Sequence, residues 1–316
     1  MSGSWVLVFP GQGAQAVGMV RDIAEALPEV RALFARADEV LGIPLAKTIF
    51  EGPEAALVDT AVQQPALVLA GLAVKKALEI KRGRPLGCSA AAGLSLGEYA
   101  ALSAVGALSF DEALRLVRKR GELMKLAASQ VPSGMAVVLN LSEEKVRAAC
   151  AQAAEETGGV VAPSNFNGGG QIVIGGANEA LAKACELCKA AGARRVIRLP
   201  VAGAFHTALM QPAGEAFAPV IDAANIQTAS QPVYANATAA RVVEAAEIRD
   251  ALKRQITSPV LWEQTVKNLV STGRRQFLEL GPGSTVSNMV KRIAPEAECR
   301  SVSTWADVQA FSEENV

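Results

Sequence analysis

The sequence predicts an α/β protein whose large domain contains a parallel, helix-covered sheet and carries a smaller inserted domain. Short apolar runs that end in Pro or Gly alternate with helical patterns along most of the chain, as expected of a parallel sheet. Between residues 129 and 200 the order changes to β-α-β-β-α-β, the split βαβ arrangement of a ferredoxin-like unit. The chain has 316 residues, of which 50% are hydrophobic, so both parts can fill a core.

The first half of the large domain begins with an apolar run, Trp5 to Phe9, which is stopped by a Pro-Gly pair and is predicted to be a buried strand. A run of small residues at 86–92 predicts a second strand, which leads through the Gly-Leu-Ser-Leu-Gly segment at 93–97 into a helix. Ser109 is followed three residues later by Glu112, a capping-box pattern that predicts a long helix to about residue 128. Further helices are expected over 30–41 and 65–80.

The inserted domain is expected to hold two helices and four short strands. Ser142, followed by two glutamates, predicts the first helix start. The strands are expected at 135–139, 160–161, 171–174 and 194–199, and the helices at 142–156 and 178–191. The large domain resumes at Val201, with helices near residues 207, 247 and 259 and a strand at 277–280. We therefore assign residues 1–128 and 201–316 to one discontinuous large domain and residues 129–200 to the insertion.

Charge and cysteine content argue against several classes of protein. Lys and Arg together number 31, as do Asp and Glu, so no net field draws the chain to nucleic acid or to a membrane surface. The five cysteines are odd in number, and the C-x-x-C pair Cys185 and Cys188 lies in a helical pattern without a second ligand pair. Buried thiols in a reducing compartment are therefore expected. Neither a signal peptide nor a membrane span is predicted, since the long apolar stretch at 88–110 contains Glu98 and several Gly and Ser residues.

Ser95 is the candidate nucleophile. It stands at the centre of a G-x-S-x-G segment, in which a tight strand-to-helix turn exposes the serine hydroxyl and glycines allow the backbone to approach closely. The start of the following helix and the Leu96 N–H can stabilise an oxyanion. In an Ala- and Gly-rich stretch the same letters also fit an ordinary helix start capped by Ser95.

His206 is the candidate base, because a serine nucleophile needs a base that titrates near neutrality and the chain contains one histidine. A lone histidine is often structural. This one, however, lies in a Gly-containing segment, 203–207, that precedes a helical pattern, and active-site residues commonly lie in such loops.

Arg120 is the candidate anion-binding residue. On a helical wheel it falls in the middle of the apolar half of the helix that starts at Ser109, close to Ala113, Val117 and Met124. A guanidinium that faces a core is costly unless an anion pairs with it. The planar guanidinium could bind a carboxylate through two parallel hydrogen bonds. The alternative is that Arg120 lies at the edge of the helix and extends its charged end into solvent.

The segment after the first strand, Pro10 to Ala16, formally satisfies the dinucleotide fingerprint G-x-G-x-x-A. Its proline lies at the turn and the acidic residue expected at the end of a second strand is missing, so a loop that presents the Gln12 N–H to an active site is the alternative. An ordinary esterase would have the order Ser, Asp or Glu, His with the histidine near the C-terminus. The only Asp between the two candidate residues is Asp111, at the helix start. A nucleotide-binding domain and a non-catalytic scaffold are the remaining rivals.

Taken together, these segments resemble the malonyl-CoA:acyl carrier protein transacylases and, similarly, the acyltransferase domains of polyketide synthases. The resemblance runs from Val8 to Gly283 and rests on the order and spacing of several short pieces. These pieces are 8–13, 93–99, 120–121, 165–167, 203–210, 254–255, 258–260 and 281–283.

The resemblance implies an α/β-hydrolase-like core with the ferredoxin-like insertion, and transfer of malonyl from malonyl-CoA to holo acyl carrier protein through an ester on Ser95. It implies no metal or redox cofactor and a monomeric protein. In the roles it implies, His206 is the base, Gln12 and Leu96 supply oxyanion-hole N–H groups, Arg120 binds the malonyl carboxylate, Phe205 selects malonyl, and Gln255 orients His206 through its backbone carbonyl.

One position departs from the family pattern. The residue before the serine is Leu94, where the family usually has a histidine, which is not the base. Some organellar members of the family also lack that histidine. A bacterial cytoplasm, or a plastid or mitochondrial matrix after removal of a transit peptide, is therefore the expected location.

Overall fold

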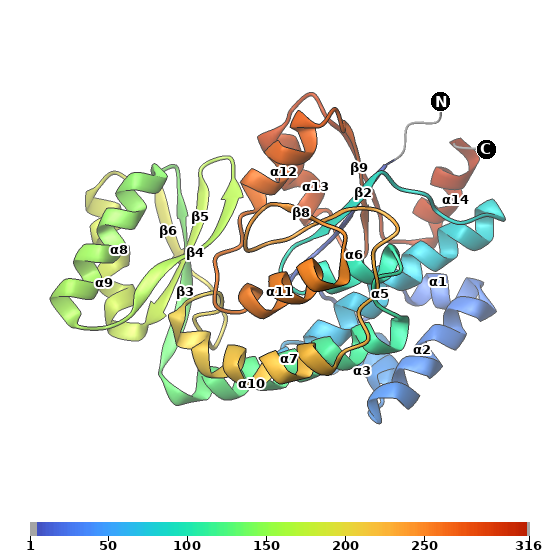
Figure 1. The fold of residues 1–316 in the computed structure, drawn as a ribbon, viewed down its shortest axis with the longest axis horizontal. Coiled ribbons are helices and arrows are strands. Elements are labelled where there is room, and N and C mark those ends of the chain that lie inside the picture. The colour runs from blue at the N-terminus through green and yellow to red at the C-terminus, as the bar shows by residue number, and fades with distance from the viewer. Residues whose placement is uncertain (1–4, 315–316) are drawn as a thin grey trace.

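The computed structural model describes residues 5–314, and within them two sheets separate the chain into a larger and a smaller part (Figure 1). The first sheet has the order β10-β9-β1-β2-β7-β8 and is parallel except for the last pair. Its strands are β1 Val6–Phe9, β2 Ala90–Gly93, β7 Val233–Tyr234, β8 Arg241–Val242, β9 Gln276–Leu280 and β10 Glu298–Val302. The second sheet has the order β4-β5-β3-β6 and is antiparallel. Its strands are β3 Ser133–Leu139, β4 Val161–Gly168, β5 Gln171–Ala177 and β6 Arg195–Arg198.

Helices cover both faces of the parallel sheet, which is why its central strands are apolar throughout. Leu7 and Phe9 of β1 enter one core, and Val6 and Val8 enter another on the opposite face. The helices of the larger part are α1 Arg21–Ala26, α2 Pro28–Leu41, α3 Leu45–Glu51, α4 Glu54–Leu57, α5 Thr60–Arg82, α6 Gly97–Ala104, α7 Phe110–Gln130, η1 Ala208–Met210, α10 Gln211–Ala223, α11 Ala245–Gln255, α12 Trp262–Ser271, α13 Thr285–Ile293 and α14 Trp305–Glu314.

The smaller part places α8 Glu143–Thr157 and α9 Asn178–Ala190 at one end of the molecule, away from α1 and α2 (Figure 1). Alternate residues of β3 serve two cores, as the period of a strand requires. Ala136 and Val138 pack with α8 and α9, whereas Met135 and Val137 belong to the core of the larger part. The second face of the antiparallel sheet therefore packs against the core of the larger part.

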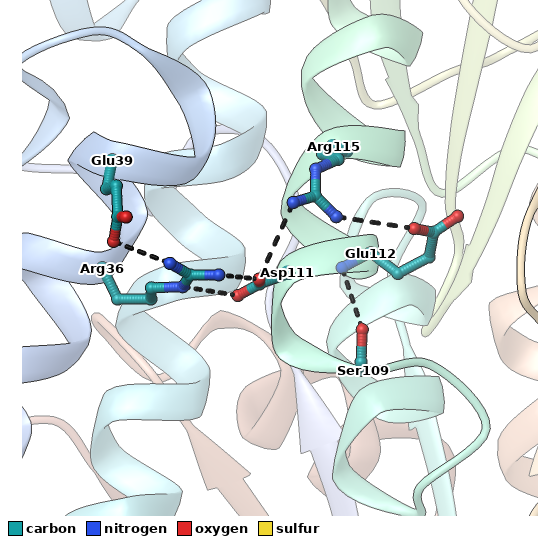
Figure 2. A network of polar contacts seen from close by, with 6 residues as sticks. All are labelled: Arg36, Glu39, Ser109, Asp111, Glu112 and Arg115. Atoms are coloured by element: carbon teal, nitrogen blue, oxygen red, sulfur yellow. Dashed lines mark hydrogen bonds and ion pairs between the residues drawn. The ribbon is translucent and has the colours of Figure 1, made fainter.

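The helix starts predicted from serines are confirmed. The Ser109 side chain accepts the Glu112 N–H at 3.1 Å, and the Ser142 side chain accepts the Lys145 N–H. Asp111 lies beside the first of these caps and binds Arg36 of α2 at 2.5 Å, with Arg115 on its other side (Figure 2). Arg36 lowers the pKa of the Asp111 carboxyl through this hydrogen bond. Asp111 is thus engaged in holding α2 against α7.

Several element boundaries differ from the expected ones. The strand expected at 86–92 is confined to Ala90–Gly93, and the helix expected from residue 65 begins at Thr60, where the Asp59 side chain accepts the Ala61 N–H. The helix expected near residue 259 begins at Trp262. The strands expected at 160–161 and 171–174 extend to Gly168 and Ala177. The tight turn between them, 168–170, consists of three glycines with positive φ.

Candidate active site

The G-x-S-x-G segment forms a sharp turn between β2 and α6. Ser95 has a φ of 54°, a left-handed conformation that is strained for a residue with a side chain. A Cβ on Gly93 would lie 2.0 Å from the backbone of Gly97, and a Cβ on Gly97 would lie 2.5 Å from the Phe9 carbonyl oxygen. Both glycines are therefore required by close backbone approach. The turn leaves Ser95 partly exposed at the carboxyl end of β2.

His206 lies against the serine. Its Nε2 is 2.7 Å from Ser95 Oγ, and its Nδ1 is 2.9 Å from the backbone carbonyl oxygen of Gln255. A carbonyl oxygen can only accept, so Nδ1 carries the proton in the neutral ring and Nε2 is left to accept the Ser95 hydroxyl. Burial and the nearby Arg120 charge lower the pKa of His206 to about 4. The ring is therefore neutral, and able to take a proton, at neutral pH.

Arg120 projects from α7 to the same point and is fully buried, as its place on the helical wheel predicted. Its Nη2 donates to Ser95 Oγ at 3.0 Å, and its Nη1 donates to Gln64 Oε1 at 2.7 Å. Its guanidinium also lies over the Tyr99 ring, 5.8 Å from the centroid. Within residues 5–314, Arg120 Nε has no hydrogen-bond partner. Burial lowers the pKa of Arg120 because the charged guanidinium is costly to bury, and an anion beside it would offset that cost.

A cavity of about 270 Å³ opens onto these three side chains. Both sheets contribute to its wall, the small sheet through Met135, Val137 and Val173. Gln12, Leu94, Leu96 and Phe205 also line it. The predicted site residues are therefore brought together from segments far apart in the sequence, and their individual roles remain predictions at this point.

The loop after β1 packs on the serine turn. A Cβ on Gly11 would lie 2.7 Å from the Leu94 carbonyl oxygen, and the Leu94 N–H donates to the Phe9 carbonyl oxygen. This close contact gives the glycine a local structural reason that needs no dinucleotide. The C-x-x-C pair lies on α9 as two free thiols, and burial raises the pKa of Cys188 to about 11.

Three polar residues of the site were not singled out from the sequence as site residues. Gln64 holds Arg120, as described above. Asn236 and Glu98 lie behind the serine turn, where the Asn236 side chain accepts the Ser95 N–H at 2.6 Å. The one available signal was Glu98 itself, a charge in an otherwise apolar stretch, which was used only to argue against a membrane span. Within residues 5–314, no helix is both long and apolar enough to cross a membrane.

Comparison with known proteins identifies the family of the chain. Residues 6–312 match the family model described as the acyl transferase domain. The fold and the site thus define an α/β acyltransferase in which a serine and a histidine meet at the cavity.

Known relatives narrow this class. The malonyl CoA-acyl carrier protein transacylase of Bacillus subtilis is 39% identical over 312 residues, which are 98% of this chain and 97% of that protein. The acyl carrier protein S-malonyltransferase of Vibrio cholerae has a crystal structure that is 38% identical, with a TM-score of 0.93 and coverage of 98% of this chain and 100% of that one. A malonyl-transacylase in complex with a type II polyketide synthase acyl-carrier protein is 39% identical, with a TM-score of 0.94 and coverage of 99% and 100%. The chain belongs to the family of malonyl CoA-acyl carrier protein transacylases.

Proposed function

We propose that the protein transfers the malonyl group of malonyl-CoA to the phosphopantetheine thiol of holo acyl carrier protein, through a malonyl ester on Ser95, and so supplies fatty acid synthesis. The observation that carries this proposal is the buried Arg120, whose Nη2 lies 3.0 Å from the serine oxygen inside the cavity. A buried cation next to a nucleophile fits an acyl group that carries a second, free carboxylate. Malonyl has such a carboxylate and acetyl does not.

In the first half-reaction, the edge of Arg120 formed by Nε and Nη2 holds the malonyl carboxylate. His206 Nε2 takes the Ser95 hydroxyl proton as Oγ bonds to the thioester carbon. The Gln12 and Leu96 N–H groups stabilise the oxyanion, and the C–S bond then breaks. The CoA thiolate leaves and receives the proton from His206. The Gln255 carbonyl keeps the ring in the tautomer that this step needs, since it accepts from Nδ1.

In the second half-reaction, the carrier thiol gives its proton to His206 and its sulfur bonds to the ester carbon. The bond between that carbon and Ser95 Oγ then breaks, and His206 returns the proton to Oγ to restore the hydroxyl. Every step is a proton or acyl transfer, so the chemistry calls for no metal or redox cofactor. Phe205 is proposed to select malonyl by filling the side of the cavity where a branched acyl group would extend. Arg120 and this ring together would define the acyl specificity.

We extend the proposal to the finer description of the fold. The order β4-β5-β3-β6 and the packing of α8 and α9 in one core support a ferredoxin-like insertion at 129–200. The strand–turn–helix at Ser95 supports an α/β-hydrolase-like domain made of 1–128 and 201–316, of which residues 1–4 and 315–316 lie outside the described part. The bacterial sources of the relatives support a bacterial cytoplasm. A role in polyketide synthesis is the second candidate, favoured by the similarity to the transacylase in complex with a polyketide carrier protein.

The second half-reaction is tested with malonyl-enzyme freed of malonyl-CoA and mixed with holo carrier protein. We expect the carrier to gain one malonyl group, and the enzyme to lose it, faster than water discharges the ester in a parallel sample. Apo carrier protein, which lacks the thiol, is the matched control and should gain nothing. Release of free malonate at the same rate with and without holo carrier would indicate a hydrolase instead. Fatty-acid and polyketide carriers compared side by side distinguish the two pathways.

A further inference from the structure

A single buried carboxylate lies behind both reacting side chains. Glu98 is the second residue of α6 and is 1% exposed. Its Oε2 accepts two hydrogen bonds, from Gln255 Nε2 at 2.7 Å and from the Asn236 N–H at 3.0 Å. Burial raises the pKa of Glu98 to about 7, and the two donors together with Arg120 act in the opposite direction.

The first donor, Gln255, is connected to both members of the reacting pair. Its backbone carbonyl accepts from His206 Nδ1, and its side-chain Nε2 also donates to the Ser95 carbonyl oxygen at 3.0 Å. Gln255 ends α11, where backbone carbonyls have no partner within the helix. The position of that free carbonyl therefore depends on what anchors the Gln255 side chain, and Glu98 is its shortest contact.

The second donor, Asn236, holds the turn that carries Ser95. Its Oδ1 accepts the Ser95 N–H at 2.6 Å, and its Nδ2 donates to the Gly93 carbonyl oxygen at 2.7 Å. These bonds span the serine turn from its first residue to its centre. The backbone N–H of Asn236, in turn, is held by Glu98.

The turn and the base both need such support. Ser95 and His206 have φ values of 54° and 60°, and neither is a glycine. Conformations of this kind are strained and persist only where the surroundings enforce them. Apart from the turn itself, Glu98 is the residue within 5–314 that has a hydrogen bond to both Gln255 and Asn236.

We propose that Glu98 is a positioning residue for the Ser95–His206 pair, in which one oxygen of its carboxylate fixes the Gln255 amide and the Asn236 backbone and so sets the distance and angle between nucleophile and base. This inference rests on the proposed acylation of Ser95. A carboxylate that served stability alone would leave that geometry unchanged when it was replaced.

Three variants separate these possibilities. Glu98→Ala removes the acceptor, whereas Glu98→Gln keeps an oxygen that can accept both bonds. Glu279→Ala is the matched control, because Glu279 is also a fully buried carboxylate that accepts two backbone N–H groups, those of Val286 and Ser287. Acylation of Ser95 by malonyl-CoA is followed by rapid quench and intact mass, and the folded state by thermal unfolding.

We expect Glu98→Ala to slow acylation at saturating malonyl-CoA by about 10- to 100-fold, since a misplacement of about 1 Å costs that much. The malonyl-CoA concentration at half-maximal rate should stay within about twofold, because Glu98 is not part of the cavity wall. Glu98→Gln should recover most of the rate. Glu279→Ala should acylate within about threefold of wild type even if its Tm falls as far as that of Glu98→Ala.

The geometry itself is observable, since His206 is the only histidine of the chain. With ¹⁵N-labelled histidine, its Nδ1–H gives one proton resonance that reports the hydrogen bond to the Gln255 carbonyl. We expect this resonance to shift or broaden in Glu98→Ala and to be kept in Glu98→Gln and Glu279→Ala. The readout needs no acyl donor, so it decides the inference even if wild type proves not to accept malonyl.

Two results would overturn the inference. One is a folded Glu98→Ala protein that acylates at the wild-type rate, and the other is a slow Glu98→Ala protein whose Nδ1–H resonance is unchanged. If Glu98→Ala does not fold, Gln255→Met removes the anchored amide and keeps the backbone carbonyl. It should then show the same loss of rate and the same shifted resonance, and a wild-type rate in that variant would equally contradict the proposal.

Discussion

Replacement of His206 by alanine is expected to lower the rate of Ser95 malonylation by about 10⁴-fold or more, the range seen when a serine enzyme loses its base. The physical reason is the 2.7 Å contact between Nε2 and Ser95 Oγ, and among the described residues that line the cavity no other His, Asp, Glu or Lys could take its place. Single-turnover mass spectrometry with malonyl-CoA measures the rate. Binding of CoA should change little, because the imidazole acts on the hydroxyl and not on the nucleotide.

The pH dependence of the wild-type enzyme is the companion control. Because burial and Arg120 lower the pKa of His206 to about 4, its base form persists well below the ordinary value of 6.5. The acid limb of kcat/KM should therefore fall near pH 4, and the His206→Ala protein should lack that limb. An activity that survives the substitution within about tenfold would mean that another group takes the serine proton.

Replacement of Arg120 by alanine is expected to change acyl selectivity. Loss of one partner of a buried charge pair costs about 3–5 kcal/mol, so kcat/KM for malonyl-CoA should fall between about 10²-fold and about 4 × 10³-fold. Acetyl-CoA has no carboxylate for Arg120 to hold, and its kcat/KM should change by no more than about tenfold through the lost Nη2 contact with Ser95. Steady-state kinetics with both thioesters gives the ratio.

Arg120→Lys is the matched variant, since it keeps a positive charge and loses the planar fork. It should retain part of the preference for malonyl while binding it more weakly. Gln64 and Tyr99, which contact the guanidinium, are not substituted in either variant. Equal losses with malonyl-CoA and acetyl-CoA would show that Arg120 supports the site as a whole and does not recognise the carboxylate.

Local chemistry made much of the fold predictable. The strand before Ser95 and the turn itself consist of small residues. At Gly93 only glycine fits, because a Cβ there would lie 2.0 Å from the Gly97 backbone. Arg120 could be placed because a charge in the apolar half of a long amphipathic helix has few alternatives. Ser142 marks the first helix start of the β-α-β-β-α-β segment with a side-chain hydrogen bond, and Ser109 marks the start of α7 in the larger part in the same way.

The parts that escaped prediction depend on contacts between distant segments. Asn236 has hydrogen bonds to Ser95, 141 residues away in the sequence, and to Glu98, 138 residues away. No local sequence pattern marks such a pairing. The strand β7 has two residues, and the edge strand β10, Glu298–Val302, alternates charged and polar residues with little apolar signal. Pairing with the buried β9 provides its order.

The central claim, a malonyl ester on Ser95, is tested most directly by the intact mass of the protein after brief incubation with malonyl-CoA, beside Ser95→Ala. The account predicts a gain of one malonyl group in wild type, located on the peptide that contains Ser95, and none in the variant. A malonyl group that the Ser95→Ala protein still acquires, or a wild-type protein that turns over malonyl-CoA without ever carrying the group, would contradict it.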